Sequence, residues 1–275
     1  MIRFLSPGAL TLAGAFLMAP VPGEAQVPSQ GVEFTLPGSI LNLRLPNGAA
    51  KSLLTPTGWG AAYNTVYGGG GYQKEVPFVN GEDADWSFGI GLGDPVQLVG
   101  IQLDGTILDL TGLTDFTFGA KIHRYLGGGT SVAVGVETLF ETLDGDGPGR
   151  DPGPSFYAAV SHTVQSWAGT RPGVGRMHLS LGLGSGRFAE MPLRVEAELG
   201  KKGGTVVFGN AAFELAENWN LIGEWDGIGL NAGMSYAFPL PGLIPSLVMG
   251  IADITGNSSD TPRLVAGAAL AFTFF

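Results

Sequence analysis

The sharpest candidate for catalysis is a histidine and a serine two residues apart in MHLSLGLG, residues 177–184. In an extended chain successive side chains point to opposite faces, so His178 and Ser180 share the more polar face of this stretch. A histidine general base beside a serine nucleophile is an arrangement of acyl hydrolases. No nearby Asp, Glu or Asn supplies a third member, and ordinary polar residues on a strand explain the pattern better. We therefore predict no catalytic residue, and a lipid hydrolase using this pair is the least favoured alternative.

A second candidate is the acidic stretch LDGDGPGRDPG, residues 143–153, in which Asp144, Asp146 and Asp151 stand among glycines and prolines. Carboxylates in a loop are calcium ligands, but the twelve-residue spacing and the terminal Glu of an EF-hand are missing. The sequence has no cysteine, which excludes disulfides and thiolate metal sites. We predict a solvated loop, no metal site and no cofactor.

A third set of polar residues is spread along the chain, always on the more polar face of its segment. The set consists of Asp85, Lys121, His123, Glu137, His178, Ser180, Glu224 and Asp226. If that face encloses an interior, such charges either pair and fill it or line a narrow water path. Pairing is favoured because an unpaired buried charge is costly. In a wet interior the acidic excess would favour cations or neutral solutes over anions.

The elements that would position these residues are short segments with period-two alternation. In residues 85–93 every second residue is large and apolar, from Trp86 to Leu92, and the others are Asp85, Ser87 or glycine. A soluble sandwich would turn the apolar face into a core, whereas a membrane barrel turns it to lipid. The polar faces are rich in Gly and Ser and poor in Lys and Glu, which suits a curved interior. The pattern predicts an all-β, closed antiparallel transmembrane β-barrel.

Composition agrees with this class. Hydrophobic residues make up 44% of the chain, charged residues 14%, and 46 residues are glycine. After residue 25 no run of about 18 apolar residues offers a spanning helix, whereas a closed barrel satisfies every backbone group in lipid. The formal charge of −10 argues against a nucleic-acid partner, which needs a cationic face. Aromatic residues at segment ends suit girdles at the two membrane interfaces; they are Trp59, Tyr67, Tyr125, Phe140, Phe156, Trp219, Trp225 and Phe238.

Turn-forming clusters of Gly, Asn, Asp and Pro divide the chain into candidate strands. The candidates are 59–67, 85–93, 96–109, 115–126, 130–141, 155–165, 176–188, 193–199, 205–216, 220–226, 228–238, 244–254 and 263–275. Single-chain bacterial barrels have an even number of strands. Residues 193–199 are short and charged, so we assign them to a loop and expect about twelve strands.

The N-terminus predicts export. Residues 1–25 combine Arg3, an apolar core and small residues before Gln26, as in a cleaved signal peptide. Residues 26–56 have only short apolar runs between Pro and Gly, and we expect an irregular leader or plug segment. The barrel itself is expected over residues 57–275, in the cell outer membrane.

The last residues, TPRLVAGAALAFTFF, read as the closing strand, and its aromatic end resembles the assembly signal of outer-membrane barrels, which implies that role for Phe272, Phe274 and Phe275. The bulkier residues up to Phe274 form the outward frame, which would put Phe275 on the inner face. Either a bulge near Thr273 restores the outward frame, or Phe275 hangs free at the periplasmic rim. Tight turns such as Asp226-Gly227 are expected at the periplasmic rim, as is the C-terminus.

Several stretches resemble an uncharacterised family of predicted outer-membrane barrels from cyanobacteria, and more distantly the YjbH-type barrels linked to exopolysaccharide export. They are TPTGWGAAYNTVYGGGGYQ (55–73), GIGLGDP (89–95), LGLGSGRF (181–188), LIGEWDGIGLNAGMSYAF (221–238) and GIADITGNSSDTPRLVAGAAL (250–270). The resemblance implies a barrel over residues 55–275 and no catalytic residue.

The sequence thus favours an outer-membrane barrel with a structural or narrow-pore role that is not an enzyme. Expected partners are the lipid bilayer, lipopolysaccharide and the barrel-assembly machinery. The alternative, implied by the resemblance, is an accessory role in surface exopolysaccharide export, with polysaccharide as a partner.

Overall fold

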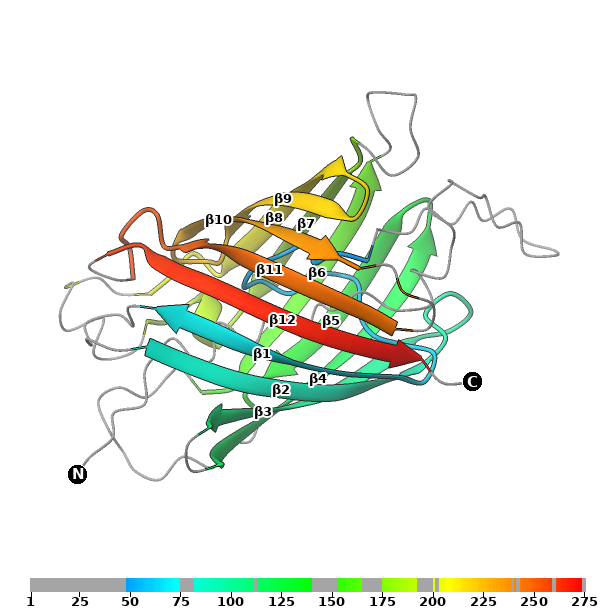
Figure 1. Ribbon diagram of the computed structural model, residues 1–275, viewed down its shortest axis with the longest axis horizontal. Helices are drawn as coiled ribbons and strands as arrows, with labels where there is room; N and C mark the ends of the chain where they lie inside the picture. The colour runs from blue at the N-terminus through cyan, green and yellow to red at the C-terminus, as the bar shows by residue number, and fades with distance from the viewer. Residues whose placement is uncertain are drawn as a thin grey trace.

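The computed structural model describes residues 48–74, 82–110, 113–139, 153–164, 175–191, 200, 203–238, 240, 243–258 and 261–273. Within these residues no helix is long and apolar enough to cross a membrane. The regular elements are twelve strands and one turn of 3₁₀ helix, drawn in Figure 1. They are β1 (Thr65–Lys74), β2 (Glu82–Gly93), β3 (Gly100–Asp109), β4 (Thr114–Gly127), β5 (Thr130–Glu137), β6 (Ser155–Val164), β7 (Met177–Gly184), η1 (Gly186–Phe188), β8 (Val207–Ala216), β9 (Trp219–Trp225), β10 (Leu230–Ala237), β11 (Leu243–Ala252) and β12 (Arg263–Thr273).

The strands form one closed sheet in which each strand pairs antiparallel with its neighbours in sequence. The barrel closes where β1 pairs with β12, from Thr65 opposite Thr273 to Gln73 opposite Val265. Closure leaves no strand edge, so the backbone groups of the sheet find partners within it. The predicted twelve-stranded antiparallel barrel is confirmed.

The first strand corrects the sequence-based expectation. We predicted a strand over 59–67, but β1 is Thr65–Lys74 and contains the glycine run Gly68–Gly71. Glycine carries no side chain to show alternation, so this strand lacks the pattern by which the others were recognised. Residues 59–62 are buried inside the barrel instead. Residues 193–199, predicted as a loop, lie outside the described residues.

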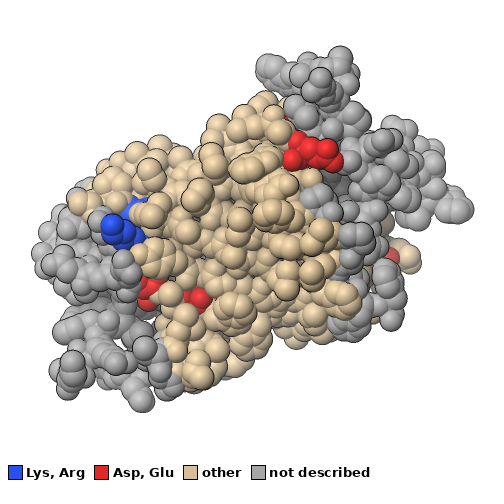
Figure 2. Space-filling view, viewed as in Figure 1, with Lys and Arg blue, Asp and Glu red and all other residues tan. Residues whose placement is uncertain are grey.

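Residues of the barrel wall alternate as predicted, with apolar side chains on the outside and polar side chains on the inside. Trp86 and Phe88 are 48% and 44% exposed, whereas Asp85 and Ser87 between them are buried. The face shown in Figure 2 is accordingly almost free of charged residues, apart from a few near its margins. An apolar exterior around a polar interior is the inverse of a soluble barrel and matches a lipid-facing wall.

The predicted aromatic girdle is only partly correct. Phe156, Trp219 and Phe238 are exposed on the outside. Trp59, Tyr67 and Tyr125, however, are buried, each 8% exposed or less, because Trp59 precedes the first strand and the two tyrosines occupy inward positions of β1 and β4. Trp225 is intermediate, and Phe140 lies outside the described residues.

The lumen contains a segment of the chain itself, residues 48–62, which we call the lumenal segment. All fifteen residues are buried. In Figure 1 this segment is the blue ribbon that runs within the ring of strands before it reaches β1. The predicted leader or plug covered residues 26–56, of which 26–47 lie outside the described residues.

The lumenal segment enters and leaves at one rim, the C-terminal rim, where β12 ends and β1 begins. Ala50 is bound there by Asn220 at the start of β9 and Ser235 near the end of β10. Residues 53–55 reach Glu224 near the far end of β9, and the chain then returns to Thr65. The segment is therefore a loop inserted into the lumen.

We expected the Asp226-Gly227 turn and the end of the last strand at the same rim, and this expectation was wrong. The turn that follows β9 and contains Asp226 and Gly227 lies at the rim opposite the end of β12, so it and the C-terminus do not share a rim. β5 and β7 also end at the rim of that turn, so the two longest connections between strands, from β5 to β6 and from β7 to β8, start and finish there. Since long loops of outer-membrane barrels are extracellular, we retain the C-terminal rim as the periplasmic one. In β12, Leu264, Leu270 and Phe272 face outward as predicted, whereas Phe274 and Phe275 lie outside the described residues.

Candidate functional site

The first part of the lumenal segment, residues 48–55, is the first arm, and its strongest contact is with Glu224 of β9. The backbone N–H groups of Leu53, Leu54 and Thr55 donate to the Glu224 carboxylate at 2.9, 2.8 and 3.2 Å. The Thr55 hydroxyl donates a fourth hydrogen bond at 2.9 Å. Hydrogen bonds to an ionised acceptor are about twice as strong as neutral ones. One buried carboxylate therefore fixes the innermost turn of the first arm.

Carbonyl groups of the first arm are bound by donors from the wall. Asn220 and Ser235 donate to the carbonyl oxygen of Ala50 at 2.9 and 2.6 Å. From the opposite rim, Arg187 donates through Nη2 to the carbonyl oxygen of Leu54 at 2.8 Å. The wall thus contacts the backbone of the arm more than its side chains.

The second arm, residues 58–62, follows the inner faces of β3 to β6. The N–H of Gly58 donates to Ser161 at 2.7 Å, and Ser131 donates to the Gly58 carbonyl oxygen at 2.6 Å. Lys121 donates to the carbonyl oxygen of Trp59 at 3.0 Å. These contacts are distributed over several strands and involve no carboxylate.

The second arm ends beside β3 and β4. The N–H of Ala61 donates to Oε1 of Gln102 at 2.9 Å. His123 Nε2 lies 3.0 Å from the Ala61 carbonyl oxygen. The ring of Trp59 lies 5.9 Å from that of Tyr125, centroid to centroid. Glycine is required at this closeness, because a Cβ on Gly58 would lie 2.4 Å from the Ser131 carbonyl oxygen.

Arg187 belongs to η1, which folds inward from the connection between β7 and β8. Its Nε donates to Glu137 at 2.6 Å, while the neighbouring Phe188 is fully buried and stacks on Phe208 with centroids 4.4 Å apart. Burial lowers the pKa of Arg187, but the nearby carboxylates, Glu137 foremost, raise it by more, so its pKa lies above the ordinary value. Arg187 is a fixed cation between Glu137 and the tip of the first arm.

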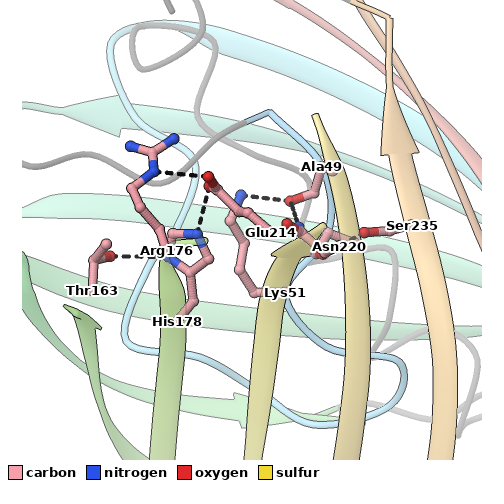
Figure 3. Close-up of polar contacts among 9 residues, drawn as sticks. Ala49, Lys51, Thr163, Arg176, His178, Glu214, Asn220 and Ser235 are labelled. Carbon is pink, nitrogen blue, oxygen red and sulfur yellow. Dashed lines mark hydrogen bonds and ion pairs between the residues drawn. The ribbon is translucent and has the colours of Figure 1, made fainter. Parts of the chain in front are cut away.

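A second polar network lies near the C-terminal rim (Figure 3). His178 Nε2 is 2.8 Å from Glu214, and its Nδ1 is 3.0 Å from the hydroxyl of Thr163. The other oxygen of Glu214 accepts from Nε of Arg176 at 2.8 Å. Figure 3 shows Lys51 of the first arm beside this network, with its Nζ donating to the Ala49 carbonyl oxygen.

This geometry corrects one premise of the argument about a hydrolase: Glu214 supplies the carboxylate beside His178 that the neighbouring sequence does not provide. Both ring nitrogens of His178 have partners other than Ser180, whose hydroxyl lies 2.8 Å from that of Ser161. His178 and Ser180 are 1% and 8% exposed. The pair therefore forms part of the hydrogen-bonded interior in this structure.

The residues selected from the sequence all face the lumen, but they do not form one cluster. Lys121, His123 and Glu224 bind the lumenal segment, and Glu137 reaches it through Arg187. Asp226 accepts from the N–H groups of Ile228 and Gly229 in its own turn. Asp85 lies apart on β2 and accepts from the N–H of Gly71.

Sequence reasoning missed Gln102, Asn210, Glu214 and Arg187. The first three occupy inward positions of β3 and β8. The period-two alternation that identified the other inward residues would therefore have been enough to find them. Arg187 lies outside a strand, and no periodicity marks it. Among the described residues no three His, Asp or Glu side chains are placed to hold a metal ion.

No family model matches the sequence, and no curated protein matches it either. Solved structures with a similar fold are outer-membrane barrels of different activities. The KdgM porin in complex with disordered oligogalacturonate has a TM-score of 0.48 and 6% identity, covering 77% of this chain and 99% of that one. The Salmonella typhi outer membrane phospholipase, a dimer with bound calcium, has a TM-score of 0.42 and 8% identity, covering 93% and 98%. An outer membrane channel from Pseudomonas putida F1 has a TM-score of 0.41 and 10% identity, covering 87% and 100%. Because porins, channels and a lipase share this architecture, the comparison concerns the fold alone.

Proposed function

We propose that this chain is an outer-membrane β-barrel with a structural or narrow-pore role, whose lumen is closed at rest by residues 48–62. The supporting observation is that fifteen consecutive residues are buried inside the barrel and that both arms of this segment are hydrogen-bonded to side chains of the wall. A solute path along the axis requires at least part of this segment to move. The role is therefore a closed barrel or a pore that opens when the segment moves.

The proposed location and partners follow from the exterior. Large apolar side chains cover the outer wall, as lipid contact requires. Residues 1–25 would be the signal peptide, and Phe272, with Phe274 and Phe275, would form the assembly signal. Lipopolysaccharide and the assembly machinery remain proposed partners, with residues 26–275 as the mature chain.

We propose that the barrel has no enzymatic activity, since His178 and Ser180 are each bonded to other residues. The accessory role in exopolysaccharide export stays a prediction, which loss of surface polysaccharide on deletion of the gene would support.

Conductance in planar bilayers tests the closed-pore proposal. Deletion of residues 26–55 removes the first arm and should raise the single-channel conductance severalfold above that of the mature chain. Deletion of residues 26–47 is the matched control, because it leaves the whole lumenal segment in place and should stay closed. Equal conductance of the mature chain and both deletions would contradict the proposal.

A further inference from the structure

The contact between Glu224 and the first arm resembles the binding of a cation. Three N–H groups and one hydroxyl converge on a single buried carboxylate. Several converging N–H donors are what a guanidinium or a primary ammonium group offers to a carboxylate. The backbone of residues 53–55 thus supplies to Glu224 the donors that such a cation would supply.

A second observation is an acceptor that the first arm leaves unsatisfied. Asn210 of β8 lies directly opposite Glu224 of β9 in the sheet and is 7% exposed. Its Nδ2 donates to the hydroxyl of Thr55 at 3.0 Å, but its Oδ1 is buried without a hydrogen-bond partner. A buried acceptor without a donor is destabilising, because the hydrogen bonds that it made to water are not replaced. The first arm therefore provides hydrogen-bond donors for the Glu224 carboxylate but none for Oδ1 of Asn210. A ligand with more N–H groups could donate to both acceptors.

The charges around this point favour a cation. Asn231 bridges Glu224 and Asp226, donating to them at 3.2 and 3.1 Å. Arg187, the cation on the other side of the arm, is paired with Glu137. Within the described residues, no hydrogen bond or ion pair joins Glu224 or Asp226 to a cationic side chain. Arg187 also interacts electrostatically with Glu224 and Asp226, but the three carboxylates of Glu137, Glu224 and Asp226 outnumber this cation, so the net charge of the four ionised groups is negative. The group lies near the rim at which β9 ends.

We propose that Glu224 and Asn210 form a binding site for an organic cation rich in N–H groups, such as a guanidinium group, and that residues 53–55 occupy this site as an internal substitute. The cation competes with the first arm and releases it, which opens the lumen. The inference rests on the proposed function and adds to it the class of ligand that moves the segment. Because the tethered arm competes at an effective concentration on the order of millimolar, the free cation acts in the millimolar range or above.

Amide hydrogen exchange on the full mature chain in detergent tests this proposal. The probe is methylguanidinium, and the control is tetramethylammonium, which has the same charge but no N–H donor. Methylguanidinium at about 100 mM should speed exchange of the amides of residues 53–55 at least tenfold, whereas tetramethylammonium should not. Exchange of the second arm, residues 58–62, should stay unchanged, which shows that the barrel has not unfolded.

Two variants make the test specific. In Glu224→Gln the amides of residues 53–55 should exchange faster without any cation, and methylguanidinium should have no further effect. Asp85→Asn removes an equally buried carboxylate of the lumen that does not bind the segment, so it should respond as the native chain does. Unchanged exchange with methylguanidinium, or an equal effect of tetramethylammonium, would overturn the inference. Neither of these two results would contradict the closed-pore proposal, because that proposal is tested by the conductance of the two deletion variants.

Discussion

The two arms of the lumenal segment are bound in different ways. Four hydrogen bonds of the first arm converge on one carboxylate, that of Glu224, and the guanidinium of Arg187 adds a second charged contact. Its other contacts with the wall are single hydrogen bonds from the neutral side chains of Asn210, Asn220 and Ser235. The second arm is bound by single hydrogen bonds to side chains of four strands, all of them neutral except Lys121. Only Tyr63 and Asn64 separate it from β1. Concentrated charged contacts can be removed by one competitor, whereas distributed contacts cannot. This difference supports the proposal that the first arm is released while the second arm stays in place.

The largest expected effect is that of Glu224→Ala on the first arm. Each of the four hydrogen bonds to this carboxylate contributes about 1.5–3 kcal/mol, and relaxation of the freed arm recovers part of the sum. We expect the local stability to fall by about 4 kcal/mol, which corresponds to roughly thousandfold faster exchange of these amides. Unchanged protection of residues 53–55 would show that the carboxylate does not hold the arm.

Gly58→Val tests the second arm. A Cβ at Gly58 would lie 2.4 Å from the Ser131 carbonyl oxygen and 2.8 Å from the Ser161 backbone nitrogen, and neither backbone atom can move without moving the sheet. Overpacking of this kind costs about 1–3 kcal/mol, and we expect the upper end in the free energy of unfolding of the whole barrel, measured in urea.

Gly223→Val is the matched control for that substitution. Gly223 lies on the outer face of β9, where a Cβ would meet nothing within 4 Å. It should leave stability within about 0.5 kcal/mol. If both glycine variants behave alike, the second arm is not tightly packed, and the distinction between the arms fails.

Arg187→Ala should have the next largest effect, again on the first arm alone. It removes the donor to the Leu54 carbonyl oxygen and leaves Glu137 without its cation. We expect a local loss of about 2 kcal/mol, the usual value of a hydrogen bond to a charged group, seen as faster exchange of residues 53–55. Replacing the exposed Arg124 of β4 by Ala should not change that exchange; a loss of protection in the second arm would contradict the assignment.

Ser180→Ala should have the smallest effect. Ser180 touches the second arm only through Ser161, whose hydroxyl still accepts from the N–H of Gly58 in the variant. We expect a loss of stability of about 1 kcal/mol or less, measured in urea beside the native chain. The same variant decides the hydrolase alternative, because lipid hydrolysis that is present in the native protein and abolished here would establish Ser180 as its nucleophile.

Much of the wall was predictable from the sequence because the strand period is fixed by backbone geometry. Once Trp86 and Phe88 are assigned to one face, Asp85 and Ser87 must occupy the other. The predictions fail in two places, one where the alternation is missing and one where it is present without a strand. Gly68–Gly71 show no alternation although they belong to β1, and Trp59 lies among alternating residues that form no strand.

Sequence alone establishes the class of fold and the faces of most strands, because both follow from local period-two alternation, and it offers the residues from Asp85 to Asp226 as candidates for the lumen. Only the tertiary structure decided what those residues bind. Glu224 and Leu53 are separated by 171 positions, and no local pattern relates them. The closed barrel encloses residues 48–62 in its lumen, where polar backbone groups removed from water must find partners in the wall. That requirement turns a lumen-lining carboxylate into the anchor of the first arm.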